Sequence, residues 1–500
     1  MDRGPLDSVM DIDLARLAAK FQGRHVVVIG DALLDVYLSG RVGRLCREAP
    51  LPIVEIEKRV EVPGGAGNVA INVAALGARA TFIGVVGDDR EGEALRRALD
   101  HAGVDVSHLV RVAGRATPAK HRLLGGPQML ARFDNGTREG IDAATLTDLI
   151  GRIARSYGAA DAVILADYGY GLFAPELIQS LAYLQRRQPR VVVADSRALA
   201  RFAPIGVTAV KPSFAEAMQL LGVNGNERGR GRAETAAMHA STLFDITRAR
   251  MVAVTLDIDG AVVLEPKRAP YRTYARPAQR SRSTGAGDTF AAAFALALAV
   301  GADTPEAAEL AAAAASVVVA KDGTQPCRAE ELRTVIDGGG KRVADAATLA
   351  ERMAMYRSTG ARIVFTNGCF DILHRGHVTL LNRAKALGDV LIVGINSDAS
   401  VRRLKGANRP INALEDRIKV LTALSYVDHV AVFDGDSPTE LIRTIHPDVY
   451  VKGGDYTRES LPEAPLVEHL GGAVCILPYL AERSTSGLIE RIRTVSPASA

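Results

Sequence analysis

The most chemically suggestive residues of the chain are two histidines, His374 and His377, in the segment TNGCFDILHRGH. At this spacing both imidazoles lie on one face of a first helical turn. Two imidazoles over a phosphate can donate hydrogen bonds to the charge that builds up as pyrophosphate leaves. Taken alone, the pair could equally be packing or surface histidines. Zinc is a weaker alternative, because no third Cys or His ligand lies at a suitable spacing.

The elements around these histidines would place them at the edge of a sheet. The apolar run Arg362–Phe365 is typical of a buried strand. We expect the chain to turn through Asn367 and Gly368 and to enter a helix near Arg375. Ligands of open α/β sheets bind at such carboxyl ends of strands, where backbone N–H groups at the next helix start can hold a phosphate.

Two later segments also suit phosphate binding. Lys452 lies in VKGGD, where a predicted strand ends in a Gly-rich turn. Arg483 begins the segment RSTSG, which we expect to open the last helix. The hydroxyls of Ser484, Thr485 and Ser486 would form a second anion site there, although helix capping alone could explain them.

A Gly-rich turn in the first half of the chain suits phosphoryl transfer. The sequence Gly285, Ala286, Gly287 directly precedes Asp288 and the predicted helix Thr289–Ala299. Backbone N–H groups at the start of a helix stabilise developing phosphate charge, and the neighbouring carboxylate can accept a proton from a hydroxyl. A tight turn with a capping Asp is the alternative interpretation.

A second Gly-rich segment, Gly64–Asn68, mimics a dinucleotide-binding fingerprint. The preceding residues Ile53–Pro63 alternate apolar and charged side chains and end in Pro. This pattern predicts a half-exposed antiparallel strand rather than the buried parallel strand that the fingerprint requires. We therefore reject the dinucleotide interpretation.

The order of apolar runs and amphipathic helices predicts an α/β protein with mostly parallel sheets. Three consecutive glycines in DGGGK (Asp337–Lys341) resist regular structure and indicate a linker between two halves. We place the first domain at residues 1–337, the linker at 338–345 and the second domain at 346–500.

Length, composition and charge exclude several classes of protein. With 500 residues, 48% hydrophobic and 24% charged, the chain can form two or three cores. Its net charge of +4 gives no support for nucleic-acid binding. The N-terminus does not resemble a signal peptide, and no apolar run is long enough to span a bilayer. Four scattered cysteines are typical of reduced thiols. We expect a soluble, cytoplasmic protein that does not bind membranes.

The motifs of the second half resemble the cytidylyltransferase-like superfamily. They are NGCFDILHRGH, NSD, RLKG, RP, EDR, VKGGDY and RSTSG, spread over nearly all of residues 346–493. The resemblance implies a Rossmann-like nucleotidyltransferase domain with a parallel sheet. It also implies catalytic roles for His374, His377 and Lys452, and nucleotide contacts from Asn367, Gly368, Phe370, Asp398, Arg417, Arg483, Ser484, Thr485 and Ser486.

The first half resembles a ribokinase-type carbohydrate kinase over roughly residues 20–336. The matching motifs are GD, EAP, PGGAGN, DY, Glu216 and TGAGD. The resemblance implies a ribokinase-like α/β domain with a small β lid, with Asp288 as base. Sugar contacts would come from Asp31, Gly65, Asn68, Lys120, Arg122 and Arg132, and nucleotide contacts from Glu216, Gly285, Ala286 and Gly287.

Four positions depart from the kinase pattern. Arg282 replaces the first Asp of DxTGAGD, Ser213 the Asn of NxxE, Tyr170 the Lys of DYxKG, and Arg197 the Lys of DPK. These changes surround one nucleotide site. They leave open a kinase that is slow, uses altered metal coordination or is inactive.

The two halves together resemble the bifunctional heptose 7-phosphate kinase/heptose 1-phosphate adenylyltransferases. This resemblance implies phosphorylation of D-glycero-D-manno-heptose 7-phosphate at its anomeric hydroxyl and adenylyl transfer from ATP to heptose 1-phosphate. Mg²⁺ would accompany ATP at both sites, no metal would be held by the protein alone, and the chain would be a homo-oligomer, a homodimer.

Three alternatives remain at this point. The first half could be a degenerate kinase that serves sugar-phosphate binding or oligomerisation. A cytidylyltransferase would use CTP instead of ATP. A class I aminoacyl-tRNA synthetase would need a KMSKS-like loop and a basic surface, and the sequence contains neither.

Overall fold

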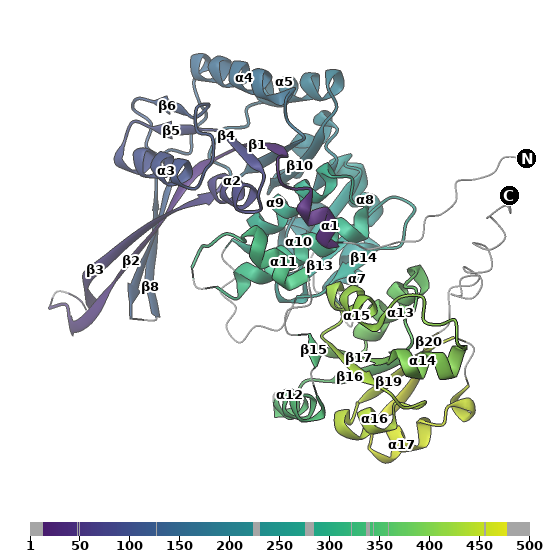
Figure 1. Cartoon of the computed structure of the whole chain (residues 1–500). Helices are drawn as coiled ribbons and strands as arrows, with labels where there is room; N and C mark the ends of the chain where they lie inside the picture. Colours follow the sequence, from purple (N-terminus) through teal and green to yellow (C-terminus); the bar gives the residue numbers. More distant parts are fainter. Residues whose placement is uncertain are drawn as a thin grey trace, which may run out of the picture. The chain divides into compact units, whose positions relative to one another are not determined.

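The computed structural model describes residues 14–477 apart from 48, 50, 127, 224–230, 276–284, 322, 337–340, 344, 359 and 455–456. The contacts divide the chain into two units, one of residues 16–333 and one built mainly from residue 334 onward (Figure 1). The described chain opens with the short helix α1 (Leu14–Ala19).

An eight-stranded sheet in the order β14-β13-β12-β11-β10-β9-β1-β4 forms the centre of the first unit. The neighbouring strands from β4 to β12 in this order pair in parallel. The strand β13 pairs antiparallel with both β12 and β14. Continuous Val/Ile runs such as Val26–Ile29 are fully buried, as strands covered on both faces require. The strands are β1 (His25–Gly30), β4 (Arg79–Ile83), β9 (Ala162–Asp167), β10 (Val191–Ser196), β11 (Ala209–Val210), β12 (Met251–Thr255), β13 (Ala261–Leu264) and β14 (Tyr271–Thr273).

Helices cover both faces of this sheet (Figure 1). The helix α9 begins at Ala286, three residues before the predicted start, so that Asp288 lies inside its first turn. The helices are α2 (Ala66–Ala75), α3 (Arg90–His101), α4 (Ala143–Tyr157), α5 (Pro175–Arg187), η1 (Leu199–Ile205), α6 (Phe214–Leu221), α7 (Arg232–Met238), α8 (Ala240–Thr247), η2 (Asp257–Asp259), α9 (Ala286–Ala299), α10 (Thr304–Val319) and α11 (Ala329–Ile336).

A four-stranded sheet in the order β3-β2-β7-β8 forms the lid of the first unit (Figure 1). The strand β3 runs antiparallel to β2, which confirms the strand type predicted for Ile53–Pro63. The lid strands are β2 (Ala32–Leu45), β3 (Pro52–Gly65), β7 (Ala119–Gly125) and β8 (Gln128–Asn135), and a separate pair comprises β5 (Val85–Gly87) and β6 (Val110–Val112).

The second unit contains a parallel six-stranded sheet in the order β15-β18-β17-β16-β19-β20. Chain order reverses between β16 and β19, and such a switch point is where open α/β sheets bind ligands. The elements are β15 (Arg342–Val343), α12 (Ala346–Ser358), β16 (Ile363–Gly368), α13 (Arg375–Lys385), β17 (Val390–Asn396), α14 (Asp398–Lys405), α15 (Leu414–Ala423), β18 (His429–Phe433), α16 (Thr439–Ile445), β19 (Val449–Gly453), η3 (Arg458–Ser460), α17 (Ala464–His469) and β20 (Ala473–Leu477).

Local expectations in the second unit need three corrections. Asn367 and Gly368 do not form a turn, because parallel pairing with β17 continues to the end of β16. The linker expected at 338–345 contains β15, whose apolar Val343 is buried beside β18. The spacings of Ser437 with Glu440 and of Asn412 with Glu415 predict two capping boxes, and neither forms. Pro438 is the N-cap of α16, and α15 begins after Ala413 without a side-chain cap.

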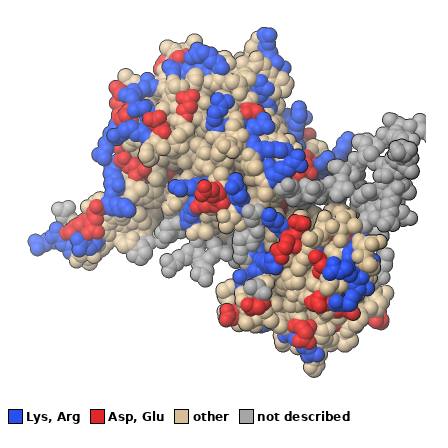
Figure 2. All heavy atoms as spheres, viewed as in Figure 1, with Lys and Arg blue, Asp and Glu red and all other residues tan. Residues whose placement is uncertain are grey.

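Within the described residues, no helix combines the length and apolar character that a membrane span requires. On the face shown in Figure 2, Lys and Arg side chains are interspersed with Asp and Glu over both units.

Candidate active sites

The Gly-rich turn of the first unit lies at the start of α9. Gly285 is the N-cap with a φ of 90°, a backbone conformation that glycine adopts readily. A Cβ on Gly285 would also lie 2.8 Å from Nδ2 of Asn68. The N–H groups of the following turn have no partner within an α-helix, so they are suited to bind an anion.

Two hydrogen bonds fix the carboxylate of Asp288. The Tyr168 hydroxyl donates to Oδ1 at 2.6 Å, and the Asn68 amide donates to Oδ2 at 2.7 Å. Burial raises the pKa of Asp288, and the two hydrogen bonds oppose that shift. A raised pKa makes an oriented carboxylate a better proton acceptor, which is what a general base requires.

Asn68 was expected to contact the sugar, but its amide is directed at the base. Behind it, Asn72 donates to both the backbone and the side-chain oxygen of Asn68. The hydroxyl of Thr289 and the backbone N–H of Cys327 in turn donate to Oδ1 of Asn72. Asn68 therefore belongs to a buried polar network that orients Asp288.

Tyr168 connects this network to the remaining sugar-site residues. Its backbone N–H donates to Asp31 at 2.8 Å, and burial raises the pKa of Asp31 to about 6. A Cβ on Gly65 would lie 3.1 Å from the Tyr168 ring, and Nζ of Lys120 lies 5.8 Å from the ring centroid. Tyr168 belongs to the DY motif of the kinase resemblance, but the sequence did not indicate it as a site residue.

Three basic residues lie on the lid strands β7 and β8, which pair side by side. Lys120 pairs with Asp134, and Arg122 pairs with Arg132. The Arg122 guanidinium lies 2.6 Å from Asp35, and Arg132 makes a bidentate contact with Asp134. Burial lowers the pKa of Lys120. The lid thus presents cations whose carboxylate partners orient them.

The polar residues at the ends of β10 and β11 are arranged differently from the family pattern. Glu216 closes a capping box with Ser213 at the start of α6. Arg197 is largely exposed, 3.7 Å from Glu216. Lys211, which sequence reasoning missed, lies buried 3.0 Å from Asp195. Its position directly after a buried strand is the signal that would have found it. Arg282 lies outside the described residues.

The two histidines of the second unit lie in contact at the start of α13. His374 is the N-cap, and its Nδ1 accepts the Gly376 N–H at 3.1 Å, which places the proton of the neutral ring on Nε2. The two ring centroids are 3.9 Å apart. Burial, and then the neighbouring His374, lower the pKa of His377 to about 3. Both rings are therefore suited to act as neutral hydrogen-bond donors.

The other predicted nucleotide residues surround this pair at the switch point. The Tyr450 hydroxyl donates to Asn367, and Phe370 packs against His377 with ring centroids 5.4 Å apart. At the end of β19, Lys452 lies 5.6 Å above the Tyr450 ring, and burial lowers its pKa. Arg483, Ser484, Thr485 and Ser486 lie outside the described residues.

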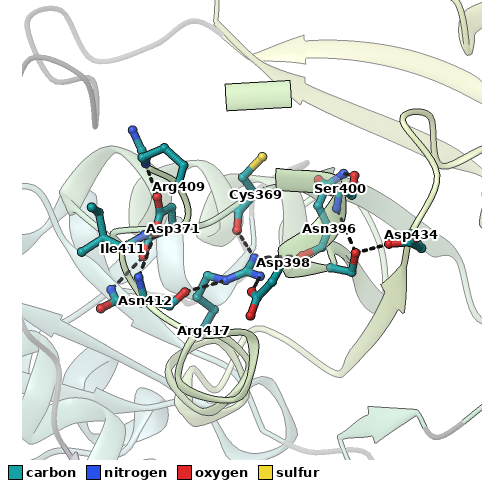
Figure 3. Close-up of polar contacts among 11 residues, drawn as sticks. Cys369, Asp371, Asn396, Asp398, Ser400, Arg409, Ile411, Asn412, Arg417 and Asp434 are labelled. Atoms are coloured by element: carbon teal, nitrogen blue, oxygen red, sulfur yellow. Dashed lines mark hydrogen bonds and ion pairs between the residues drawn. The ribbon is translucent and has the colours of Figure 1, made fainter. Parts of the chain in front are cut away.

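Arg417 is not placed to contact a nucleotide directly. Its side chain is fully buried and donates to the backbone oxygens of Asn412, Cys369 and Asn396 at 3.1, 2.6 and 2.9 Å (Figure 3). Its remaining contact is with the Asp398 carboxylate at 2.6 Å. The guanidinium therefore ties together the loop after β16, the end of β17 and the start of α14.

Asp371, which the sequence did not single out, holds a second loop against the histidine loop. Its buried carboxylate binds Arg409 and accepts the backbone N–H groups of Ile411 and Asn412 (Figure 3). The Asn412 side chain donates back to the Asp371 carbonyl at 2.8 Å. The loop that precedes α15 is thereby fixed beside the nucleotide site.

Comparison with known proteins gives one consistent result. The sequence matches the pfkB family carbohydrate kinases over residues 24–331 and the cytidylyltransferase-like family over residues 365–476. The "Bifunctional protein HldE" of Caulobacter vibrioides is 38% identical over 97% of this chain and 100% of the relative. That of Azotobacter vinelandii is 39% identical over 95% of this chain and 98% of the relative.

Among solved structures, phosphofructokinase-2 from Escherichia coli superposes with a TM-score of 0.52 at 22% identity, covering 62% of this chain and 97% of that chain. This likeness shows a ribokinase-like fold for the first unit. The chain belongs to the HldE family of bifunctional proteins and joins a pfkB-type sugar kinase to a cytidylyltransferase-like nucleotidyltransferase.

Proposed function

We propose that the chain catalyses two separate steps in the formation of ADP-heptose. The first unit transfers the γ-phosphoryl group of ATP to the anomeric hydroxyl of D-glycero-D-manno-heptose 7-phosphate. The second unit joins AMP from ATP to heptose 1-phosphate and releases pyrophosphate. A separate phosphatase must remove the 7-phosphate between the steps. The observation that carries this proposal is that each unit has buried, oriented catalytic side chains at a helix start.

In the kinase, Asp288 accepts the proton of the attacking hydroxyl while Tyr168 and Asn68 keep its carboxylate in place. The N–H groups around Gly287 stabilise the charge on the transferred phosphoryl group. The cations Lys120, Arg122 and Arg132 bind the phosphate of the sugar substrate.

In the transferase, a phosphate oxygen of the sugar attacks the α-phosphorus of ATP, and pyrophosphate leaves. The neutral His374 and His377 donate hydrogen bonds to the charge that develops, and Lys452 neutralises the triphosphate. Asn367, Gly368 and Phe370 shape the cradle. We also propose, from the sequence, that the triphosphate is bound by Arg483, Ser484, Thr485 and Ser486.

We propose that Mg²⁺ binds at each site together with ATP. In such sites Mg²⁺ usually binds through substrate phosphates and one or two carboxylates. Among the described residues, no group of three or more His, Cys, Asp or Glu is arranged to hold a metal ion. In the kinase, Asp195 and Glu216 are the carboxylates that would hold it. When bound there, Mg²⁺ would supply positive charge that offsets the negative charge of the phosphate groups.

We propose that the chain acts as a homodimer in the cytoplasm. Half a dozen large apolar side chains are exposed on the lid: Val42, Leu45, Leu51, Ile56, Met129 and Phe133. Large apolar side chains exposed together on one small sheet are typical of a protein–protein interface. The free cysteines and the use of ATP support the cytoplasm as the compartment of this protein.

We propose that the kinase domain occupies residues 1–337 and the transferase domain residues 346–500. Because β15 pairs with β18, residues 342–343 also belong with the transferase sheet.

Asp288→Asn should abolish kinase turnover by removing the proton acceptor. We expect a fall in kcat of about 10²–10⁴-fold, with adenylyl transfer unchanged. ADP formation from ATP, Mg²⁺ and heptose 7-phosphate measures it, and Asp245→Asn on the exposed face of α8 is the matched control. A wild-type chain that forms no ADP would show instead that the kinase domain is degenerate.

His377→Ala should slow pyrophosphate release from ATP and heptose 1-phosphate by about 10²–10³-fold. Because burial holds the pKa of His377 near 3, its ring is neutral at every pH well above that value. The ratio of wild-type to variant kcat should therefore stay constant between about pH 6 and 8. The exposed His469→Ala is the control. A wild-type acid limb near pH 6.5 that disappears in His377→Ala would contradict this assignment.

Arg417→Lys should impair the transferase by loosening its loops. A single ammonium cannot reach the four oxygens that the guanidinium binds, so we expect a loss of about 1–3 kcal/mol of unfolding free energy for each acceptor left without a donor. Thermal unfolding and adenylyl transfer are measured together, with the exposed Arg402→Lys as control. Weaker ATP binding at unchanged stability would instead indicate direct nucleotide contact.

The lid proposal predicts a mass of twice the 53.0 kDa chain in sedimentation equilibrium. Leu51→Glu combined with Met129→Glu should shift the protein toward monomer by placing charges in the apolar surface. Ile258→Glu, equally exposed but outside the lid, should leave the mass unchanged. A monomeric wild type, or a double variant that remains dimeric, would rule out this interface.

A further inference from the structure

Lys211 is a buried cation in the nucleotide half of the kinase site. It follows β11, and its backbone N–H donates to Ala194 of the neighbouring strand β10. The residue is 5% exposed, and Nζ lies 3.0 Å from the Asp195 carboxylate. Both side chains stand at the carboxyl ends of adjacent parallel strands, the edge where this sheet binds ligands.

The Lys211 ammonium also reaches the start of α9. A Cβ on Gly287 would have Nζ of Lys211 as its nearest neighbour, at 3.2 Å. Among the described residues, no other heavy atom comes within 4 Å of that position once the helix's own backbone and the two residues flanking Gly287 are set aside. The Lys211 ammonium therefore borders the space over Gly287. Asp288, the base, is the next residue.

A structural ion pair alone does not account for this arrangement. Moving two charges from water into a protein interior costs several kcal/mol, and well-packed apolar side chains often stabilise such a position as well or better. The Lys211–Asp195 pair, only 5% and 9% exposed, lies beside the start of α9.

Lys211 also supplies charge that the altered motifs lack. Arg197, at the position of the DPK lysine, points outward with its side chain 81% exposed. Tyr170 replaces the lysine of DYxKG. Neither residue brings a cation to Gly287, whereas Lys211 does.

We propose that Lys211 is a catalytic residue of the kinase, and that its ammonium binds the γ-phosphoryl oxygens of ATP beside the N–H groups of Gly285–Gly287. The anomeric oxygen of the sugar forms a bond to the γ-phosphorus as the bond from that phosphorus to the β–γ bridging oxygen breaks. The hydroxyl proton moves to Asp288, and ADP leaves with the bridging oxygen. Lys211 neutralises the equatorial oxygens during this transfer.

This role rests on the kinase activity proposed above, and it is tested on the full-length chain. Lys211→Met should lower kinase kcat by about 10²–10³-fold, the usual effect of removing one preorganised donor. The KM for heptose 7-phosphate and the inhibition constant of ADP should change little, because neither ligand carries the transferred group at that position. Lys211→Arg keeps the positive charge but is larger than an ammonium side chain. Its kinase kcat should therefore lie between those of the wild type and Lys211→Met.

Two controls separate catalysis from folding. Lys267→Met, at an exposed position of the same domain, should behave as wild type. Adenylyl transfer by the same Lys211 variants should also be unchanged. Should Lys211→Met unfold the kinase domain, Lys211→Gln, which retains a hydrogen-bond donor for Asp195, takes its place in the comparison.

The outcomes are distinguishable. A wild-type chain without kinase turnover would overturn the kinase assignment itself. If the wild type is an active kinase and the kcat of Lys211→Met or Lys211→Gln is close to the wild-type kcat, the role of Lys211 alone is overturned. A loss of kcat matched by an equal loss of ADP affinity and of domain stability would assign Lys211 to structure and overturn the proposal as well.

Discussion

Parallel strand pairing is the constraint on which both sites depend, since it brings the carboxyl ends of neighbouring strands to one edge of each sheet. In the first unit this edge carries Asp195 and Lys211 from β10 and β11, and the start of α9 joins them. In the second unit the end of β16 lies beside the end of β19, and the histidine loop follows directly. Helix starts at such an edge provide N–H groups that nothing within the helix can bind.

Burial then adjusts the chemistry of the side chains in opposite directions. It raises the pKa of Asp288, which makes the carboxylate a stronger proton acceptor. It lowers the pKa of His377, which keeps that ring neutral. Both shifts have the same cause, because an apolar surrounding disfavours whichever form is charged. The first unit therefore holds a carboxylate suited to accept a proton, and the second holds an imidazole suited to donate hydrogen bonds while neutral.

Oriented side chains need buried partners, and both sites have them. Tyr168 and Asn68 hold Asp288, while Arg417 binds three backbone oxygens and one carboxylate. A buried polar group left without a partner is costly, so such networks hold one geometry. In the structure Asn68 donates to Asp288, and Arg417 donates to the loops around the histidine pair.

The sequence by itself determined the two α/β halves, the antiparallel lid strand, and the positions of the GAGD helix start and the histidine pair. Hydrophobic period, glycine spacing and motif order are local properties of the chain, so they can be read without the fold. It could not determine partners across the chain. The contact of Tyr168 with Asp288 spans 120 residues, and Lys211 meets Gly287 only through the fold. β16 ends at Gly368, three residues after the predicted strand Arg362–Phe365, because its pairing with β17 continues that far. Only the tertiary structure chooses among such long-range contacts, since their energy depends on which surfaces are buried together.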